Sequence, residues 1–229
     1  MRVRWYGQSA FHLVPSGGGD GVFVDPFGRI EARTAGQGFR FGYPPIQGVR
    51  AQVLLVTHEH FDHNGVDAVG GSPHTVRSLA GTFETPLGPV VGVASEHDPE
   101  AGTRRGANVV FVFTVDGIRC CHFGDFGQAA LRPEQVRAIG SVDLLFVPVG
   151  GGPTIGSEGA RAVVEALRPR WVVPMRYRTE AASFLPEGVE GFTRHYRDVW
   201  HGKDSAFDTE ALPTSAGGPL VVVPAVPRP

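Results

Sequence analysis

Thr57-His58-Glu59-His60-Phe61-Asp62-His63 places three histidines and an aspartate within six residues. The segment directly follows Gln52–Val56, a short apolar run of the kind found in strands that are buried on both faces. Loops at the ends of such strands commonly carry functional residues. The alternative is a charged surface turn, but the chain has only nine histidines in 229 residues, so this local density favours a functional site.

The spacing of these side chains suits a metal ion. In an extended chain, residues i and i+2 point the same way, so His58 and His60 can close on one ion. If the backbone then turns into a short helix, Asp62 and His63 swing to the opposite side of the same pocket. Neutral imidazole and carboxylate are ligands that zinc accepts, at about 2.0–2.2 Å. The second histidine stands at i+2 rather than i+4, which excludes the H-E-x-x-H helix of zincins.

The rest of the chain alternates short apolar runs with glycine and proline, and Asp116-Gly117 between two runs is its strongest hairpin signal. The runs that predict strands are Val3–Tyr6, Phe11–Val14, Val22–Val24, Gln52–Val56, Val109–Val115, Ile118–Phe123, Leu144–Val147 and Trp171–Val173. Pro133–Ile139 and Ser157–Leu167 predict helices. This order indicates two sheets with outer helices, although periodicity alone leaves other α/β and α+β layouts open.

One long segment, residues 26–49, resists assignment. A loop of this length in a compact domain is often functional, and a surface loop or a subunit contact is an equal alternative. Its aromatic residues Phe39, Phe41 and Tyr43 could wall a pocket, although packing in the core or in an interface is the safer interpretation.

Composition indicates a single globular domain over residues 1–229, with a frayed tail at 224–229. The apolar fraction of 41% and the charged fraction of 19% exclude a disordered chain and a coiled coil. The net charge is −2 and Lys203 is the only lysine, so we expect no nucleic-acid partner. No secretory signal and no apolar run of the ~20 residues that span a bilayer are visible, so we expect a cytoplasmic protein without a membrane partner.

The motif T-H-x-H-x-D-H resembles the signature of the metallo-β-lactamase fold hydrolases. Further landmarks of that superfamily follow in order: Phe23-Val24-Asp25-Pro26, Ser95-Glu96-His97-Asp98, His122-Phe123-Gly124-Asp125, Pro148-Val149-Gly150-Gly151 and Val173-Pro174-Met175-Arg176-Tyr177. Together they cover nearly the whole chain and are most similar to the compact bacterial group that includes the ascorbate-phosphate lactonase-like proteins. The resemblance implies the metallo-β-lactamase fold, an α/β (α+β) protein built as a four-layer αββα sandwich.

The resemblance also implies a role for the residues of each motif. The ligands that it implies for the first metal ion are His58, His60 and His97, and those for a second ion are Asp62, His63 and the bridging Asp125. Asp25 would lie behind the metals and accept a hydrogen bond from a ligand histidine. Asp98 has a similar expected role, with capping of its own loop as the alternative. Zinc or manganese is expected, as one or two ions.

Arg176 departs from the pattern, because the superfamily has a histidine in its place. A guanidinium has no acceptor atom and keeps its proton, so Arg176 cannot ligate a metal and would repel a nearby cation. Only the first ion would then bind, or the second would bind weakly, or hydrolysis would be lost; Arg176 could equally pair with Asp62 or Asp125 and hold the cluster together without metal. Gln8 and Gln128 also stand where related sequences often have histidine.

These observations predict a metal-dependent hydrolase that is not a β-lactamase. A metal-bound hydroxide would attack a small ester, lactone or phosphodiester. Asp62 would orient the hydroxide or take its proton, and Arg176 would stabilise the negative oxygen that develops. The alternative is a non-catalytic or regulatory metal-binding protein with a degenerate second metal site. The expected partner is a small-molecule substrate, and family habit favours a homo-oligomer.

Overall fold

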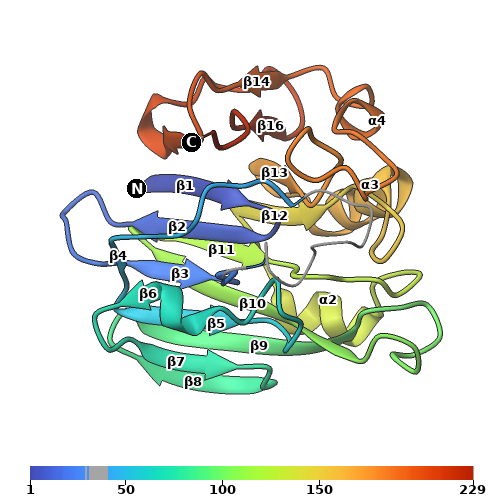
Figure 1. Cartoon of the computed structure of the whole chain (residues 1–229). Coiled ribbons are helices and arrows are strands. Elements are labelled where there is room, and N and C mark those ends of the chain that lie inside the picture. The colour runs from blue at the N-terminus through green and yellow to red at the C-terminus, as the bar shows by residue number, and fades with distance from the viewer. Residues whose placement is uncertain (29, 31–40, 229) are drawn as a thin grey trace.

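Two β-sheets face one another in the computed structural model, which describes residues 1–28, 30 and 41–228 (Figure 1). The six-stranded sheet has the order β15 (Ala206–Asp208), β1 (Arg2–Gly7), β2 (Ala10–Val14), β3 (Val22–Val24), β5 (Val53–Val56) and β7 (His74–Arg77). The eight-stranded sheet has the order β14 (Val199–His201), β16 (Leu220–Val223), β13 (Trp171–Met175), β12 (Leu144–Pro148), β11 (Ile118–His122), β10 (Ala107–Val115), β9 (Gly88–Glu96) and β8 (Gly81–Thr85). β4 (Val49–Arg50) pairs only with β6 (Val69–Gly70).

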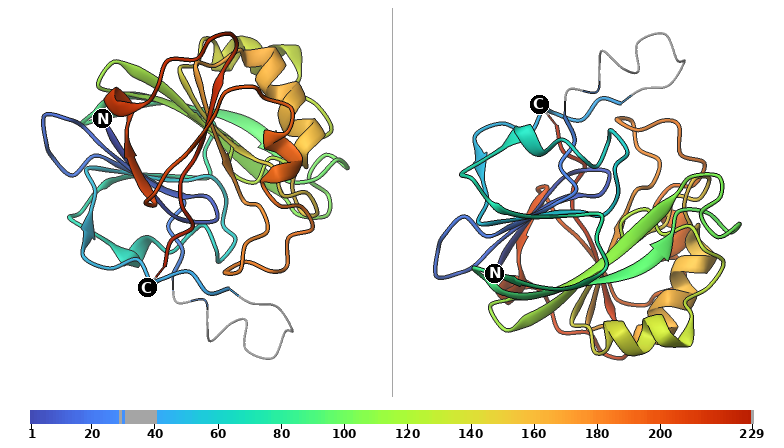
Figure 2. Two further views of the ribbon diagram at one scale, coloured as in Figure 1. Left: turned by 90° about the horizontal axis from the view of Figure 1, so that it is seen from above. Right: turned by 90° about the horizontal axis from the view of Figure 1, so that it is seen from below.

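The helices are few and short. Figure 2 shows α2 (Pro133–Ile139), α3 (Ser157–Leu167) and α4 (Glu190–Thr193) together on the outer side of the eight-stranded sheet. In α3, the apolar side chains Ala160, Val163, Val164 and Leu167 recur at helical spacing and are all buried. Two 3₁₀ turns, Val66–Ala68 and Thr209–Ala211, complete the described elements. None of these helices is long and apolar enough to cross a membrane.

Both sheets are mixed, and their strand directions bring distant segments to one edge. β3, β5 and β7 are parallel to one another, so the residues that follow β3 and β5 lie side by side. β11, β12 and β13 are also parallel. β9 and β11 are each antiparallel to β10, so β9 runs in the direction of β11. The carboxyl ends of β9, β11 and β13 therefore meet at the same edge of their sheet.

The core lies between the sheets. Phe11 of β2 packs on Phe146 of β12 with ring centroids 4.6 Å apart, and both side chains are fully buried. A second, smaller cluster forms outside the six-stranded sheet and includes Phe23, Phe27, Phe41 and Tyr43. Burying large aromatic side chains in this way supplies much of the stabilisation of such a fold. Phe41 and Tyr43 therefore pack in the core, whereas Phe39 lies outside the described residues.

The predicted two-sheet fold is confirmed, and so are the bounds of both long helices. Val115 pairs with Ile118 across the Asp116-Gly117 turn, as the hairpin signal predicted. The short helix expected after Asp62 is the 3₁₀ turn Val66–Ala68, and the residues that directly follow Asp62 form a hydrogen-bonded turn. His60 O accepts the N–H groups of both His63, at 2.9 Å, and Asn64, at 3.1 Å, which closes a single turn. Gly65 N–H then donates to Pro26 O at 2.7 Å, so the chain leaves the helical path.

The last described residues also make contacts. Ala225 N–H donates to Asp204 O at 3.0 Å, and the side chain of Val226 packs against both hydrophobic clusters. Pro224 is buried, and only Arg228 among residues 224–228 is exposed.

Candidate metal centre

The predicted site residues come from five separate strand ends that converge between the sheets. Asp25 follows β3, the segment from Thr57 to His63 follows β5, His97 follows β9, Asp125 follows β11 by two residues, and Arg176 follows β13. These segments are up to 151 residues apart in the chain, from Asp25 to Arg176. Their assembly follows from the parallel strand directions, because the carboxyl ends of parallel strands open on one edge.

Three histidines form the first candidate ligand group. One ring nitrogen from each of His58, His60 and His97 lies within 4.8 Å of the others. His58 Nε2 is 3.0 Å from His60 Nδ1, and His97 Nε2 is 3.0 Å from Asp125 Oδ2. His58 and His97 are buried, whereas His60 is half-buried. His58 and His60 therefore lie together, as their i, i+2 spacing predicted, and His97 lies beside them.

The second candidate group shares His58 with the first and adds His63 and Asp125. His63 Nε2 is 3.2 Å from Asp125 Oδ1 and 3.6 Å from Asp62 Oδ2. Asp125 and His63 are fully buried, and Asp62 is nearly so. The structure thus brings all six predicted ligands into one cluster.

Asp25 and Thr57 hold the histidines from behind. Asp25 Oδ1 accepts Thr57 N–H at 2.7 Å, and Asp25 Oδ2 accepts the Thr57 hydroxyl at 2.8 Å. The same Oδ2 lies 2.8 Å from His63 Nδ1, so His63 presents Nε2 to the centre. Thr57 Oγ1 is also 3.0 Å from His58 Nδ1. This arrangement fixes which ring nitrogens face the cluster, and the contribution of Thr57 was not foreseen from the sequence.

Asp98 does not orient a ligand histidine, so the role expected for it behind the metals is wrong. Its Oδ1 accepts the backbone N–H groups of Glu100 and Gly102, at 2.9 and 3.0 Å, and its Oδ2 accepts those of Arg104 and Arg105, at 3.1 and 2.7 Å. His97 Nδ1 instead faces Pro153 O at 3.0 Å. Asp98 therefore organises the loop between β9 and β10, which was the alternative interpretation.

Asp125 enters the centre through a constrained turn. Gly124 has a φ of +54°, and a Cβ there would lie 2.5 Å from Asn108 Oδ1 and 2.6 Å from Thr57 Oγ1. Asn108 Oδ1 accepts Asp125 N–H at 3.0 Å, while Asn108 Nδ2 donates to Phe123 O at 2.9 Å. Only glycine fits this close approach, which places the Asp125 carboxylate among the histidines.

Arg176 points into the same cluster. Its Nη1 donates to Asp62 Oδ2 at 2.8 Å and lies 3.3 Å from His63 Nε2. Its Nη2 is 2.7 Å from Asp125 Oδ2, an ion pair without hydrogen-bond alignment. The side chain is 5% exposed, and its Nε is buried without a hydrogen-bond partner among the described residues. Arg176 thus contacts both carboxylates that the sequence analysis named as its alternatives.

The electrostatics differ across the cluster. Burial lowers the pKa of His58 and of His60, and neighbouring imidazoles lower both further, so these rings are neutral. Burial also opposes the charge of His63, but Asp125, Asp62 and Asp25 outweigh it and raise its pKa to about 10. Burial raises the pKa of Asp125, yet Arg176 and His63 hold it well below its ordinary value. Asp125 is therefore ionised.

The donor set fits a divalent cation. Three imidazoles and a carboxylate are ligands typical of zinc and of other first-row metals. His97 Nε2 and both oxygens of Asp125 are buried and have no hydrogen-bond partner among the described residues. Arg176, His63 and His97 lie within ion-pair distance of the Asp125 carboxylate, but no aligned hydrogen bond satisfies these atoms, so the residues present fit a bound ion.

A cavity of about 410 Å³ opens onto the cluster. It is lined by Phe41, His60, Phe61, Asp62, His97, Arg105, Pro153, Arg176 and Phe184. Three aromatic rings make the wall largely apolar, and Arg105 and Arg176 supply two fixed positive charges. The sequence analysis named Phe41 as a possible pocket residue, whereas Phe61, Pro153 and Phe184 were not foreseen.

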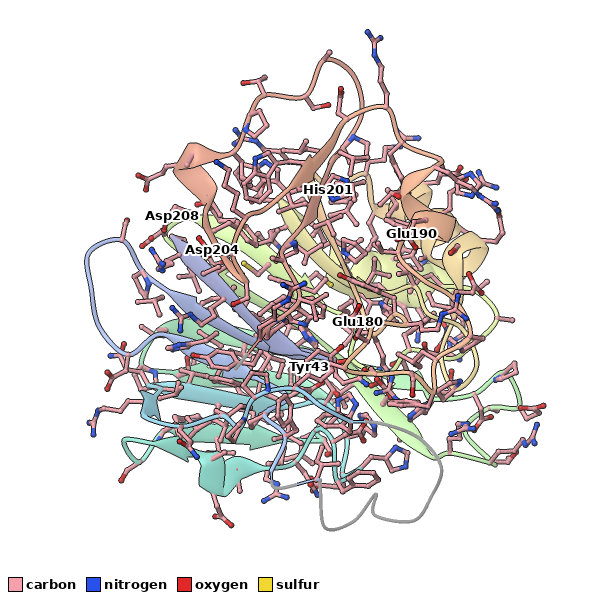
Figure 3. The ribbon with its side chains drawn as sticks, turned by 45° about the horizontal axis from the view of Figure 1, so that its top comes forward. Tyr43, Glu180, Glu190, His201, Asp204 and Asp208 are labelled. Atoms are coloured by element: carbon pink, nitrogen blue, oxygen red, sulfur yellow. The ribbon has the colours of Figure 1, made fainter. Side chains whose placement is uncertain are left out.

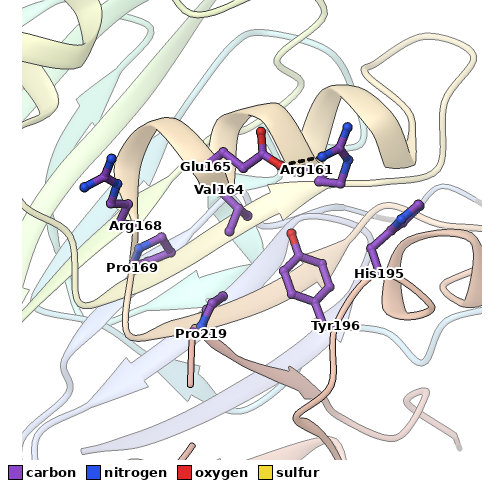
Figure 4. A pocket seen from close by; sticks show the side chains of 9 residues that line it. Arg161, Val164, Glu165, Arg168, Pro169, His195, Tyr196 and Pro219 are labelled. Carbon is purple, nitrogen blue, oxygen red and sulfur yellow. Dashed lines mark hydrogen bonds and ion pairs between the residues drawn. The ribbon is translucent and has the colours of Figure 1, made fainter. Parts of the chain in front are cut away.

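Two of the larger cavities lie elsewhere and share no residue with the candidate metal groups. Figure 4 shows one of about 750 Å³ beside α3, where Val164, Glu165 and Tyr196 contribute to the lining. The other, of about 540 Å³, is lined in part by Glu180, Glu190 and His201, which Figure 3 labels. Neither holds a group of ligands comparable to the cluster among the described residues.

The two glutamines behave differently. Gln128 Nε2 donates to Ala130 O at 2.6 Å and to Gln135 Oε1 at 2.8 Å, so its amide supports the segment before α2. Gln8 has a φ of +49° and is fully buried, and neither its Oε1 nor its Nε2 has a hydrogen-bond partner among the described residues.

Comparison with known proteins gives consistent matches. A family model described as a β-lactamase superfamily domain matches residues 2–176. A UPF0173 metal-dependent hydrolase from Pyrobaculum arsenaticum is 30% identical over 208 residues, which cover 78% of this chain and 85% of the relative. Another from Cupriavidus taiwanensis is 30% identical over 230 residues, covering 81% and 77%.

Among solved structures, a candidate Zn-dependent hydrolase of the metallo-β-lactamase superfamily from Thermotoga maritima has the same fold. It is 28% identical to this chain, the match covers 97% of this chain and 98% of that one, and the TM-score is 0.75.

Proposed function

Because the chain belongs to the β-lactamase superfamily and, within it, to the UPF0173 metal-dependent hydrolases, we propose that it hydrolyses a small ester, lactone or phosphodiester. The observation that carries this proposal is the meeting of His58, His60, His97 and Asp125 at the base of an open cavity. A divalent ion held there, zinc or manganese, supplies the usual chemistry of such centres, which is activation of water and polarisation of the scissile bond.

The chain's own residues prepare the reaction. Pro153 O lies at hydrogen-bond distance from His97 Nδ1, and Thr57 Oγ1 lies at hydrogen-bond distance from His58 Nδ1. The Nε2 atoms of both rings therefore face the cluster. Burial raises the pKa of Asp62, but His63 and Arg176 lower it below its ordinary value, so this carboxylate is available to orient a water molecule or accept its proton. Arg176 Nε is buried without an acceptor and can stabilise a developing oxyanion.

The cavity favours a particular class of substrate. Its aromatic walls suit an apolar body, and Arg105 provides a second cation for a phosphate or carboxylate on the same molecule. A volume of about 410 Å³ suits a small molecule. The net charge of −2 argues against nucleic acid as the substrate, because phosphate backbones are bound through clustered basic side chains. An anionic lactone, the substrate class suggested by the ascorbate-phosphate lactonase-like resemblance, belongs to this proposal.

The test is hydrolysis by protein reconstituted with zinc or manganese. The panel should include a chromogenic phosphodiester, a chromogenic ester, and lactones with and without a phosphate or carboxylate. Metal-dependent turnover is expected, with a loss of at least about a hundredfold in His97→Ala. His74→Ala, at an exposed histidine on β7, is the matched control and should retain full activity.

The contribution of Arg105 can be separated from the chemistry. Arg105→Ala should raise KM for the anionic substrates while leaving kcat nearly unchanged, because Arg105 lines the cavity but is not one of the candidate ligands. Arg104→Ala is the control, since Arg104 is exposed and pairs with Glu100 at 3.4 Å. If the protein binds metal but hydrolyses nothing, the alternative of a non-catalytic metal-binding protein, which the Arg176 ion pairs favour, replaces this proposal.

A further inference from the structure

The two candidate ligand groups are not equivalent, because a guanidinium occupies only one of them. Arg176 contacts Asp62 Oδ2 at 2.8 Å, Asp125 Oδ2 at 2.7 Å and His63 Nε2 at 3.3 Å. Asp62, His63 and Asp125 are the residues that the resemblance implies as ligands of a second ion, and His63 and Asp125 belong to the second candidate group. No hydrogen bond or ion pair joins Arg176 to His60 or His97 among the described residues, so the guanidinium pairs with the residues of only one side of the cluster.

We propose that this chain holds one metal ion, bound by His58, His60 and His97 with Asp125, and that the guanidinium of Arg176 takes the place of a second ion. The inference rests on the metal centre of the proposed function and adds its stoichiometry. Asp125 Oδ2 lies 3.0 Å from His97 Nε2 and 2.7 Å from Arg176 Nη2, so this carboxylate faces both the proposed ligand histidines and the guanidinium.

The charges of the cluster support a single ion. Asp25, Asp62 and Asp125 bring three buried carboxylates, and Arg176 neutralises one of them. At most two negative charges then remain to balance an ion, which is enough for one divalent cation and too few for two. A second divalent ion would leave an excess of positive charge in a buried site, which is strongly unfavourable.

The backbone fixes Arg176 in this place. Arg176 has a φ of +53°, a conformation that non-glycine residues seldom adopt. Gly150 packs so closely that a Cβ there would lie 2.1 Å from Arg176 O. Val149 N–H also donates to Met175 O at 3.0 Å. These contacts fix the backbone of Arg176, and the ion pairs with Asp62 and Asp125 hold its guanidinium.

Metal counting tests the inference without reference to turnover. Metal-free protein is loaded with Zn²⁺ alone, excess ion is removed, and the metal is counted by elemental analysis, with calorimetric titration of the affinities. One ion per chain is expected for the wild type and for the charge-retaining Arg176→Lys. Arg176→Gln should gain a second, weaker ion because Asp62, His63 and Asp125 are released. Arg176→His adds a ligand and should bind that second ion about 10–100-fold more tightly than Arg176→Gln.

A second readout uses Mn²⁺. The wild type should give the resolved hyperfine spectrum of an isolated ion, and Arg176→His the spectrum of a coupled pair. Two ions of similar affinity in the wild type, or no ion at all, would overturn the inference. A single ion in folded Arg176→Gln and Arg176→His would also overturn it, because the guanidinium would then not be the reason. If Arg176→His does not fold, circular dichroism reveals this. The number of ions bound by Arg176→Lys and by Arg176→Gln then decides whether the guanidinium charge excludes the second ion. One bound ion without hydrolysis would refute the proposed function and leave the inference about stoichiometry standing.

Discussion

Replacing Asp25 by asparagine removes one charge from behind the metal centre without changing the volume of the side chain. Asparagine also tolerates the left-handed backbone at this position, where φ is +49°. Asp25 accepts Thr57 N–H through Oδ1 at 2.7 Å, and it meets the Thr57 hydroxyl and His63 Nδ1 through Oδ2, each at 2.8 Å. An amide group offers one oxygen only. In the better orientation of the asparagine, its oxygen still accepts Thr57 N–H. Its NH₂ group then faces the Thr57 hydroxyl and His63 Nδ1, which need an acceptor.

The expected cost follows from these contacts. Hydrogen bonds to a charged group contribute about 1.5–3 kcal/mol each, so weakening two of them lowers the free energy of unfolding by about 3 kcal/mol at the low end. For a domain of this size, about 1 kcal/mol shifts Tm by roughly 2–4 °C, so Asp25→Asn should melt about 6–12 °C below wild type. Thermal unfolding of the metal-free proteins, followed by circular dichroism, measures this directly.

Asp208→Asn is the matched control for this change. Asp208 is exposed and lies 3.5 Å from Arg2, and exposed ion pairs contribute at most about 1 kcal/mol. The control should therefore melt close to wild type. If Asp25→Asn melts as the control does, the buried hydrogen bonds assigned to Asp25 do not contribute to stability, and its role behind His63 must be abandoned.

Three further outcomes are expected. Gly124→Ala should lower the free energy of unfolding by at least about 2 kcal/mol more than Gly117→Ala in denaturant titrations, because both have positive φ but only Gly124 is crowded. Asp116→Asn should destabilise the protein by about 1 kcal/mol at pH 7. The Ser16 N–H lowers the pKa of Asp116, so this difference should persist above pH ~4 and vanish as the pH falls through the folded-state pKa; a constant difference would refute the assignment. Asp98→Ala should speed proteolysis within the β9–β10 loop, since four N–H groups lose their acceptor.

Local features were predictable from the sequence because they depend on neighbours in the chain. The i, i+2 spacing placed His58 and His60 together, and the helical spacing of apolar residues gave the bounds of Ser157–Leu167 as observed. The turn after Asp62 was not predictable in this way. It ends early because Gly65 bonds to Pro26, a residue 39 positions away whose approach no local pattern records.

The long-range part of the centre could be named only by resemblance. Nothing in the spacing links His97 to Asp125, and their 3.0 Å contact depends on the directions of β9, β10 and β11. Asp98 shows the limit of that approach. Its neighbour in the chain is a candidate ligand, but its own carboxylate turns back to four N–H groups of its loop. The position of Asp98 next to His97 in the motif therefore did not predict what the Asp98 carboxylate does.

Strain and unsatisfied polar groups gather at the same strand ends. Gln8, Asp25 and Arg176 all adopt positive φ. Each such residue lowers the stability of the fold by about 1–2 kcal/mol. Of the buried side-chain atoms without a hydrogen-bond partner among the described residues, all but the Tyr196 hydroxyl belong to Gln8, Ser9, His97, Asp125 and Arg176. The acceptors among them call for a cation, and the free Arg176 Nε donor calls for an anionic oxygen. The proposed hydrolytic centre, with one bound ion beside the fixed charge of Arg176, would meet both needs at one point.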